Sequence, residues 1–256
     1  MHRTALAALI LLAAPALAQQ EEDRPVRTRI MLGPQLVPSY PGADDHALRP
    51  YGDISRARGD DDFAFEAPDE SFGLALIRSD RFQMGPSLGF EGKRDASNVG
   101  AAVPTVGFTF EAGAFAQYQL IPAIRVRAEL RKGIGGHKGL IGSVGADYVT
   151  RDRDRWLFSI GPRVTLADAR YHRAYFGVTP ATAAATALPA FRPDGGVQAV
   201  GVTAGTLYQF SPRWGVAGYA KYDRLVAEPA RSPLVRSFGS RDQLSGGIAL
   251  SYTFGR

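Results

Sequence analysis

Three histidines and their acidic neighbours are the side chains best suited to acid–base or metal chemistry. His46 directly follows two aspartates and His172 lies four residues after Asp168, so imidazole and carboxylate groups could share a metal ion or a proton. None of the histidines, His137 included, falls in a pattern with a serine and a carboxylate that indicates a nucleophilic site. We therefore interpret them as polar loop residues that cap turns. The sequence predicts no catalytic residue, no metal site, no cofactor and no enzymatic activity.

Charged and apolar residues alternate from position 124 to position 131. Apolar side chains fall on one parity and the charged ones on the other. Four consecutive charges on one face cannot occupy a dry core, because even paired buried ions seldom recover their desolvation cost. They require a wet interior or solvent. The residues expected to line such an interior are Arg125, Arg127, Glu129, Arg131, Asp147, Arg163 and Lys221.

This charged inner face has two interpretations. It could line a pore whose basic excess favours anions, or it could form a salt-bridged, hydrated filling that holds the barrel in shape without conduction. At about twelve strands the lumen is wider than that of a side-chain-filled eight-stranded barrel and narrower than that of a sixteen-stranded porin. The non-conducting interpretation is preferred, and both stay open.

The last stretch, residues 243–254, shows most clearly which elements position these charges. Apolar or aromatic side chains occupy one parity, and polar or very small ones occupy the other. The pattern is longer than the usual soluble strand of about 5–6 residues and matches the about 9–11 residues of a membrane-spanning strand. The sequence thus predicts a transmembrane β-barrel closed by this strand.

The rest of the chain repeats this rhythm and predicts an all-β, antiparallel, up-and-down transmembrane β-barrel of about twelve strands. Phe63 and Phe65 mark the expected third strand, and residues 72–76 mark a weaker fourth. If these two are one irregular excursion, the count falls to ten. Long connections at residues 38–47, 92–105, 167–196 and 225–240 alternate with short ones at 79–81, 121–122, 151–154 and 211–213, as such barrels require.

The first residues resemble a secretory signal, with a basic start, an apolar centre and Ala16-Leu17-Ala18 before a polar run. We expect residues 1–18 to be a signal peptide, 19–26 a periplasmic leader and 27–256 the barrel. The chain has no cysteine, which excludes thiolate chemistry and disulfides. Without the signal's one arginine the formal charge is 29 − 25 = +4, spread along the chain, so nucleic acid is not an expected partner.

Two of the long connections have compositions typical of folded loops. Their aspartates suit Asx-type turns, and their aromatic rings could pack over the barrel mouth. The residues expected in such an outer-loop cap are Tyr40, Asp44, Asp45, Asp168, Tyr171, Tyr175 and Phe176.

Several separate motifs, in order along nearly the whole mature chain, resemble the MltA-interacting protein / OmpV family of Gram-negative outer-membrane proteins. They are Tyr40–Asp45, Ala128–Gly133, Gly136–Leu140, Gly161–Arg163, Ala167–Tyr171, Tyr175–Val178, Ser232–Val235 and Gly239–Gln243. The resemblance implies an outer-membrane barrel in contact with lipid. For the name-giving members it also implies a scaffold that brings a murein-degrading lytic transglycosylase together with a murein synthase.

Three functions remain as hypotheses. The first is a non-enzymatic outer-membrane scaffold for murein enzymes, which rests mainly on the resemblance. The second is a small, anion-preferring channel or transporter, which rests on the charged inner face. The third is a surface enzyme acting on lipid or polymer, which only the loop histidines and aspartates favour.

Overall fold

The computed structural model describes residues 24–255, which form one antiparallel sheet of twelve strands. Ten strands have 10 to 14 residues, enough to cross a bilayer when tilted. They are β1 (Val26–Pro38), β2 (His46–Arg58), β5 (Phe82–Glu91), β6 (Thr109–Ile121), β7 (Ile124–Gly135), β8 (Leu140–Asp152), β9 (Trp156–Ala167), β10 (Gly196–Gln209), β11 (Trp214–Leu225) and β12 (Asp242–Phe254). The other two strands, β3 (Phe72–Gly73) and β4 (Ile77–Arg78), have two residues each.

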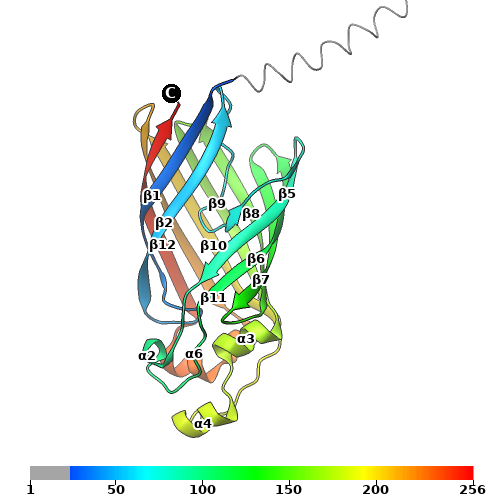
Figure 1. Cartoon of the computed structure of the whole chain (residues 1–256), viewed down its shortest axis with the longest axis vertical. Helices are drawn as coiled ribbons and strands as arrows, with labels where there is room; N and C mark the ends of the chain where they lie inside the picture. The colour runs from blue at the N-terminus through cyan, green and yellow to red at the C-terminus, as the bar shows by residue number, and fades with distance from the viewer. Residues whose placement is uncertain (1–23, 256) are drawn as a thin grey trace, which may run out of the picture.

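The sheet curls into a barrel, and its first and last long strands pair with each other. The ladder between β1 and β12 runs from Thr28 opposite Phe254 to Leu36 opposite Gly246. From β12 each strand pairs with its predecessor in the chain, back to β5 (Figure 1). The predicted all-β, up-and-down barrel is confirmed.

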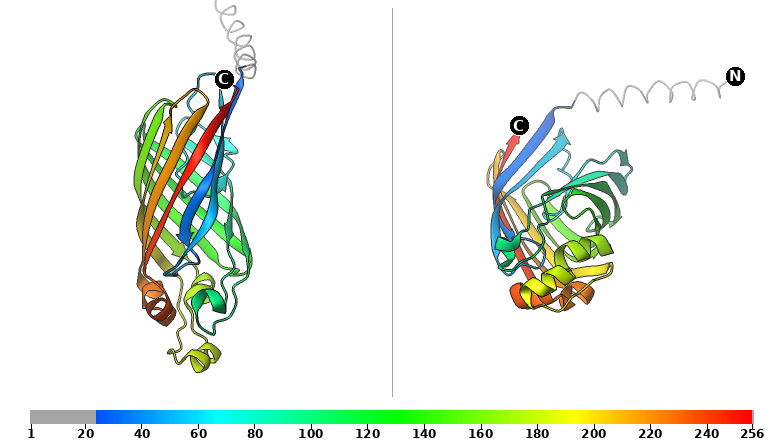
Figure 2. Two further views of the ribbon diagram at one scale, coloured as in Figure 1. Left: turned by 90° about the vertical axis from the view of Figure 1, so that its left-hand side faces the viewer. Right: turned by 60° about the horizontal axis from the view of Figure 1, so that its bottom comes forward.

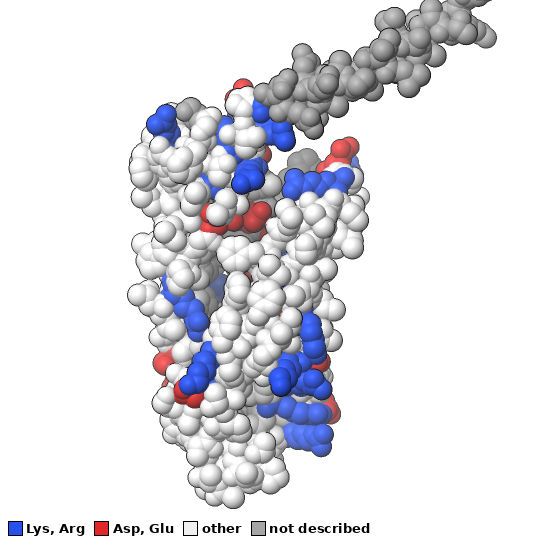
Figure 3. All heavy atoms as spheres, in the orientation of Figure 1, with Lys and Arg blue, Asp and Glu red and all other residues white. Residues whose placement is uncertain are grey.

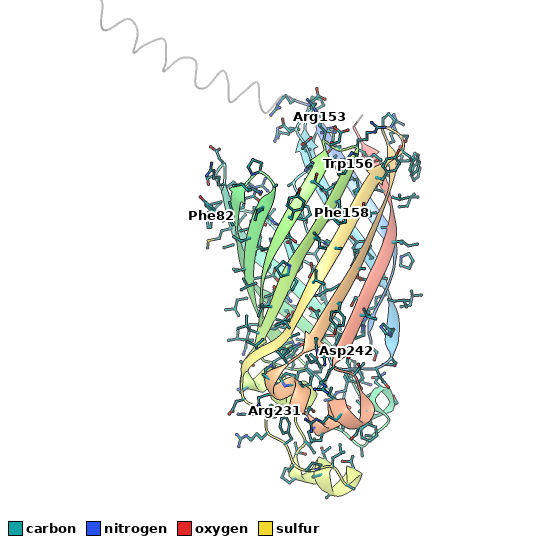
Figure 4. All side chains as sticks on the ribbon, turned by 180° about the vertical axis from the view of Figure 1, so that it is seen from behind. Phe82, Arg153, Trp156, Phe158, Arg231 and Asp242 are labelled. Atoms are coloured by element: carbon teal, nitrogen blue, oxygen red, sulfur yellow. The ribbon has the colours of Figure 1, made fainter. Side chains whose placement is uncertain are left out.

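Alternation along each long strand separates an apolar outer surface from a polar inner one. In β12, Leu244 and Ile248 expose 58% and 69% of their surface, while Ser251 and Thr253 expose 0% and 2%. Successive side chains of a strand point to opposite faces, so an apolar exterior and a polar interior follow from the period of two. Trp156 and Phe158 show the same outward orientation on β9 in Figure 4.

The two ends of the barrel differ. The ends of the described chain and the short connections lie together at what we term the turn end (Figure 1). The long connections lie at the opposite, helical end, as the loop lengths predict (Figure 2). The helices there are α2 (Ala96–Val99), α3 (Ala169–Phe176), α4 (Pro180–Thr186), α5 (Ala227–Arg231) and α6 (Pro233–Phe238). Among residues 24–255, no helix is long and apolar enough to cross a membrane.

The predicted strand at Phe63 and Phe65 is wrong. After β2 the chain turns at Gly59 and passes inside the barrel, where the aromatic rings contact arginines of the inner wall. Residues 72–78 then return to the sheet as the short strands β3 and β4 along β5. The predicted signal peptide and most of the predicted leader lie outside the described residues.

The sheet has a seam that no ladder closes. Within residues 24–255, β2 pairs only with β1, while β3 and β4 pair only with β5. Figure 1 shows the seam between β2 and β5, and Figure 3 shows Asp and Glu atoms in the recess between their upper parts. The predicted pairing of the last strand with the first is therefore present, but no ladder joins β2 to β5.

The junction between β1 and β12 depends on a glycine. A Cβ added at Gly33 would lie 2.0 Å from the carbonyl oxygen of Ile248, so a side chain there forces the two strands apart. We expect Gly33→Val to cost at least about 1–3 kcal/mol, the usual penalty of overpacking. The fraction of refolded protein with heat-modifiable gel mobility should fall accordingly. Gly218→Ala, where the nearest atom is 3.5 Å away, should refold like the native chain.

Candidate functional site

The inner space of the barrel holds a stretch of chain that we call the acidic segment, residues 60–71. It contains six Asp or Glu residues and no Lys or Arg. It enters from the turn end after β2 and leaves the lumen at β3. The ring of Phe63 is 1% exposed, so at least this part of the segment is fully enclosed.

Asp69 is the most extensively bound residue of the acidic segment. The Arg163 guanidinium donates to both of its carboxylate oxygens, through Nε to Oδ2 and Nη2 to Oδ1, each at 3.0 Å. Lys221 Nζ lies 3.2 Å from Oδ2, and the Thr203 hydroxyl donates to the same oxygen at 2.9 Å. Strands β9, β10 and β11 are thereby connected through one carboxylate.

Glu70 is bound by β7, on the other side of β8 from β9. Its carboxylate accepts from Arg125 of β7 and lies 3.7 Å from Nε of Arg127. Asp147 of β8 connects the contacts of Asp69 with those of Glu70, because it accepts hydrogen bonds from Arg125 and from Arg163 at 2.7 Å each. Charge-assisted bonds of this kind are about twice as strong as neutral ones.

Arginines also hold the aromatic rings of the acidic segment. The guanidinium carbons of Arg27 and Arg29 lie 5.0 and 4.3 Å from the ring centre of Phe63, and that of Arg125 lies 4.4 Å from the ring centre of Phe65. These are cation–π distances. Phe63 and Phe65, which the sequence predicts to lie in a strand, thus contact arginines of the inner face of the barrel instead.

The network continues toward the helical end. Glu129 accepts from Arg127 at 3.0 Å and contacts Arg131. Arg131 donates to Glu111 at 2.8 Å, and His137 Nε2 lies 2.9 Å from the second oxygen of that carboxylate. Because the amide of Gly139 donates to Nδ1 of His137, we assign the ring proton to Nε2.

Each residue that the sequence predicts for the lumen has its side chain in this inner network. Arg125, Asp147 and Arg163 form its centre, and Lys221 joins them through Asp69. Sequence reasoning missed the partners: Asp69, Glu70 and Glu111, and the wall residues Arg27 and Arg29. The available signal was the purely acidic composition of residues 60–71 beside strands rich in arginine.

Two cavities flank the acidic segment. The larger, about 420 Å³, lies toward the helical end and has both basic and acidic lining residues, among them Arg127, Arg163 and Lys221 with Glu129, Asp147 and Asp223. The smaller, about 110 Å³, lies toward the turn end against Phe65 and Ser159. The acidic segment therefore lies between the two cavities, and Glu70 and Ser71 line both.

A folded cap covers the helical end. Tyr171, Tyr175 and Phe176 of α3 are buried in one apolar cluster, and Tyr40 is buried in a second. Asp168 is the N-cap of α3 and accepts from the amide of Tyr171 at 2.8 Å. Burial raises the pKa of the Tyr171 and Tyr175 phenols, which keeps both neutral.

The connection between β1 and β2 is bound by a side chain at the start of β12. The side chain of Gln243, at the start of β12, accepts from the Gly42 amide at 2.9 Å and donates to the Ala43 carbonyl at 2.8 Å. Gly42 has a φ of 94°, a conformation that favours glycine. Asp44 and Asp45 are exposed at this hairpin and lie outside the apolar clusters.

The histidines do not converge on a reactive site. His46 is exposed and contacts the Leu244 carbonyl, His137 belongs to the inner network, and His172 is enclosed in the cap. Across residues 24–255 no group of three His, Cys, Asp or Glu side chains is arranged to hold a metal ion. The described contacts of the three histidines are ion pairs, hydrogen bonds and packing contacts.

His172 makes the cap sensitive to acid. Burial lowers its pKa below 6.5, although the bond to the Asp194 carbonyl and the charges of Asp168 and Glu228 act in the opposite direction. The unfolded cap takes up a proton that the folded cap disfavours, so cap stability falls as the pH drops below about 6.5, by about 1.4 kcal/mol per unit of pKa depression. Proteolysis of residues 169–186 should therefore accelerate between about pH 7.5 and about pH 5.

His172→Gln should remove most of this pH dependence, whereas His46→Gln, at an exposed histidine, should retain it. Equal acid sensitivity in the native chain and in His172→Gln would assign the effect to another group.

Comparison with known proteins identifies the chain. The family model described as MltA-interacting protein MipA matches residues 30–254. No curated protein matches the sequence. Among solved structures, the translocator domain of the autotransporter NalP from Neisseria meningitidis aligns at 11% identity over 97% of this chain and 95% of that one, with a TM-score of 0.40.

Pseudomonas putida OprB aligns at 9% identity over 94% of this chain and 97% of that one, with a TM-score of 0.41. At these values the structural alignments carry no argument about function, and the fold rests on the strand pairing described above. The family match covers most of the chain and includes nearly all of the barrel. The chain belongs to the MltA-interacting protein MipA family and is an outer-membrane β-barrel.

Proposed function

We propose that this protein is a non-enzymatic scaffold that holds murein enzymes at the outer membrane. The expected partners are a lytic transglycosylase of the MltA type and a murein synthase. The family name supports the first partner, because it describes proteins that interact with MltA. The resemblance of the sequence motifs supports the second.

The observation that carries this proposal is the filled lumen. The acidic segment lies in the interior and is ion-paired to β7, β9 and β11, and the cap covers the helical end. A barrel so closed offers its surface, rather than its interior, to other molecules. An ion-paired filling suits a protein that acts through its surface.

The turn end provides the partner surface in this proposal, since its short connections match the periplasmic turns of outer-membrane barrels. Short turns alone offer little area against the about 800 Å² per partner of a standard interface. The structure adds a concave element there, a groove of about 330 Å³. We call it the rim groove; it is lined by Arg27, Asp60, Asp62, Arg153, Asp154, Arg155, Gln209, Ser211 and Pro212.

Charge reversal in the rim groove tests the proposal. Arg153 and Arg155 are exposed, so Arg153→Glu with Arg155→Glu should leave folding intact. It should reduce retention of a purified MltA-type transglycosylase on the immobilised, refolded protein by about tenfold or more, which corresponds to about 1.4 kcal/mol of binding free energy. Retention is measured by quantitative pull-down at a fixed salt concentration.

A matched control changes two exposed arginines at the helical end, Arg231 and Arg236, to glutamate. Figure 4 shows Arg153 and Arg231 at opposite ends of the barrel. The control should retain the transglycosylase like the native chain. Loss in the control alone would place the partner surface at the helical end, and no retention by the native chain would exclude the scaffold.

A second candidate is a small outer-membrane channel that prefers anions. The specific observation in its favour is the basic wall, in which Arg125, Arg163 and Lys221 meet around a segment that is not part of the sheet. In the described conformation the acidic segment and the cap both obstruct that path, so we rank the channel second.

A further inference from the structure

We infer that the basic wall of the lumen is a binding site for paired carboxylates, and that the acidic segment occupies it as an intramolecular ligand. The inference concerns the interior and goes beyond the scaffold function. The external ligand is a molecule with two neighbouring carboxylates, spaced like those of Asp69 and Glu70. In the described conformation the chain's own carboxylates exclude it.

The acidic segment is held as a ligand is held, by side chains of its surroundings. Its own amide-to-carbonyl bonds are local turns, such as Asp61 to Arg58 and Glu70 to Ala67. Wall side chains bind its backbone instead: Arg151 donates to the Phe63 carbonyl at 2.9 Å. Residues 60–71 contribute no strand to the sheet, so the β-ladders remain complete without them.

The wall recognises carboxylates specifically. Arg163 binds Asp69 with two parallel N–H···O bonds, the geometry that distinguishes a guanidinium–carboxylate pair from a simple charge contact. Lys221 and Thr203 complete the shell of that carboxylate. Two neighbouring carboxylates thus meet four basic groups from three strands, Arg163, Lys221, Arg125 and Arg127.

Space for an external ligand adjoins this site. The cavity of about 420 Å³ shares Arg127, Arg163 and Lys221 with the contacts of Asp69 and Glu70. A dicarboxylate in that cavity reaches the same guanidinium and ammonium groups. It then competes directly with the acidic segment.

The open seam gives the acidic segment a way out. Its C-terminal end continues into β3, which pairs with β5 and not with β2. Withdrawal through the seam breaks ion pairs but no ladder between β2 and β5. An intramolecular ligand has a high effective concentration, so an external one must compete with it at millimolar levels or bind after it is neutralised.

Neutralising the internal ligand tests the site. In Asp69→Asn with Glu70→Gln, the acidic segment loses the two carboxylates that bind the wall. The wall should then bind N-acetyl-Asp-Glu-amide, measured by isothermal titration calorimetry on the refolded full chain. The native chain should bind this dipeptide at least about tenfold more weakly than the double variant does, as expected for competition with a tethered group. N-acetyl-Asn-Gln-amide, which has the same shape without the charges, should bind neither protein.

A matched variant, Asp60→Asn with Asp61→Asn, removes two charges from the exposed start of the same segment and should behave like the native chain. Heat-modifiable gel mobility establishes that each variant folds. If the double variant does not fold, Glu70→Gln alone replaces it in the binding measurement. Asp69 then still binds Arg163 and Lys221, and only the partners of Glu70 are free to bind the dipeptide. Equal binding of the charged and neutral dipeptides, or no binding to any neutralised variant that folds, would overturn the inference.

A second measurement follows the segment itself. Ser159 is buried and lines the smaller cavity together with residues of the acidic segment. Because the chain has no cysteine, Ser159→Cys introduces a single thiol next to the segment. Its labelling by a water-soluble thiol reagent should accelerate about tenfold or more when Asp69 and Glu70 are neutralised, since charge-assisted bonds then no longer hold the segment. Labelling at the native rate would show that the carboxylates do not hold the segment in place, which also contradicts the inference.

Discussion

Charges on the inner face of a membrane barrel must be paired or hydrated. The structure depends on the ion pairs that Arg125 and Arg163 form with carboxylates. Asp147 lies between the two guanidinium groups and cannot neutralise both. An arginine left unpaired in a buried position costs several kcal/mol. The acidic segment supplies the missing carboxylates, and so the chain after β2 passes through the lumen instead of forming a full-length strand.

The open seam follows from the same constraint. Residues 60–71 are used inside the barrel, so only residues 72–78 remain to extend the sheet beyond β5, and they form two short strands. The acidic segment thereby lies between two cavities of the interior, and the two ends of the barrel differ in character. The turn end carries the charged rim groove, whereas the helical end carries an apolar cap around Tyr171 and Phe176.

Much of this arrangement was predictable from local patterns. The period of two in β7 and β12 gave the apolar outside and the charged inside, because a strand imposes that period on its faces. Phe63 and Phe65 misled the strand assignment, since rings that alternate beneath arginines leave the same pattern as rings that alternate in a sheet.

The partners of the inner charges were not predictable in this way. Asp69 and Arg163 are 94 residues apart, and no local pattern encodes such a contact. Electroneutrality gave the only clue, because a purely acidic stretch lay among strands with basic inner faces. The cap could be anticipated from its Asp and aromatic composition, whereas its helices and the enclosed His172 depend on packing between distant loops.

The acidic segment, ion-paired to the inner wall, fills the lumen and should block the passage of ions. Single-channel conductance of the refolded full-length protein in a planar bilayer tests this most directly, with folding established beforehand by heat-modifiable gel mobility. A barrel filled in this way should fold and carry no steady current at neutral pH. A steady, anion-selective current through the native protein would contradict this, because ions would then be passing a lumen that Asp69 and Glu70 should hold closed.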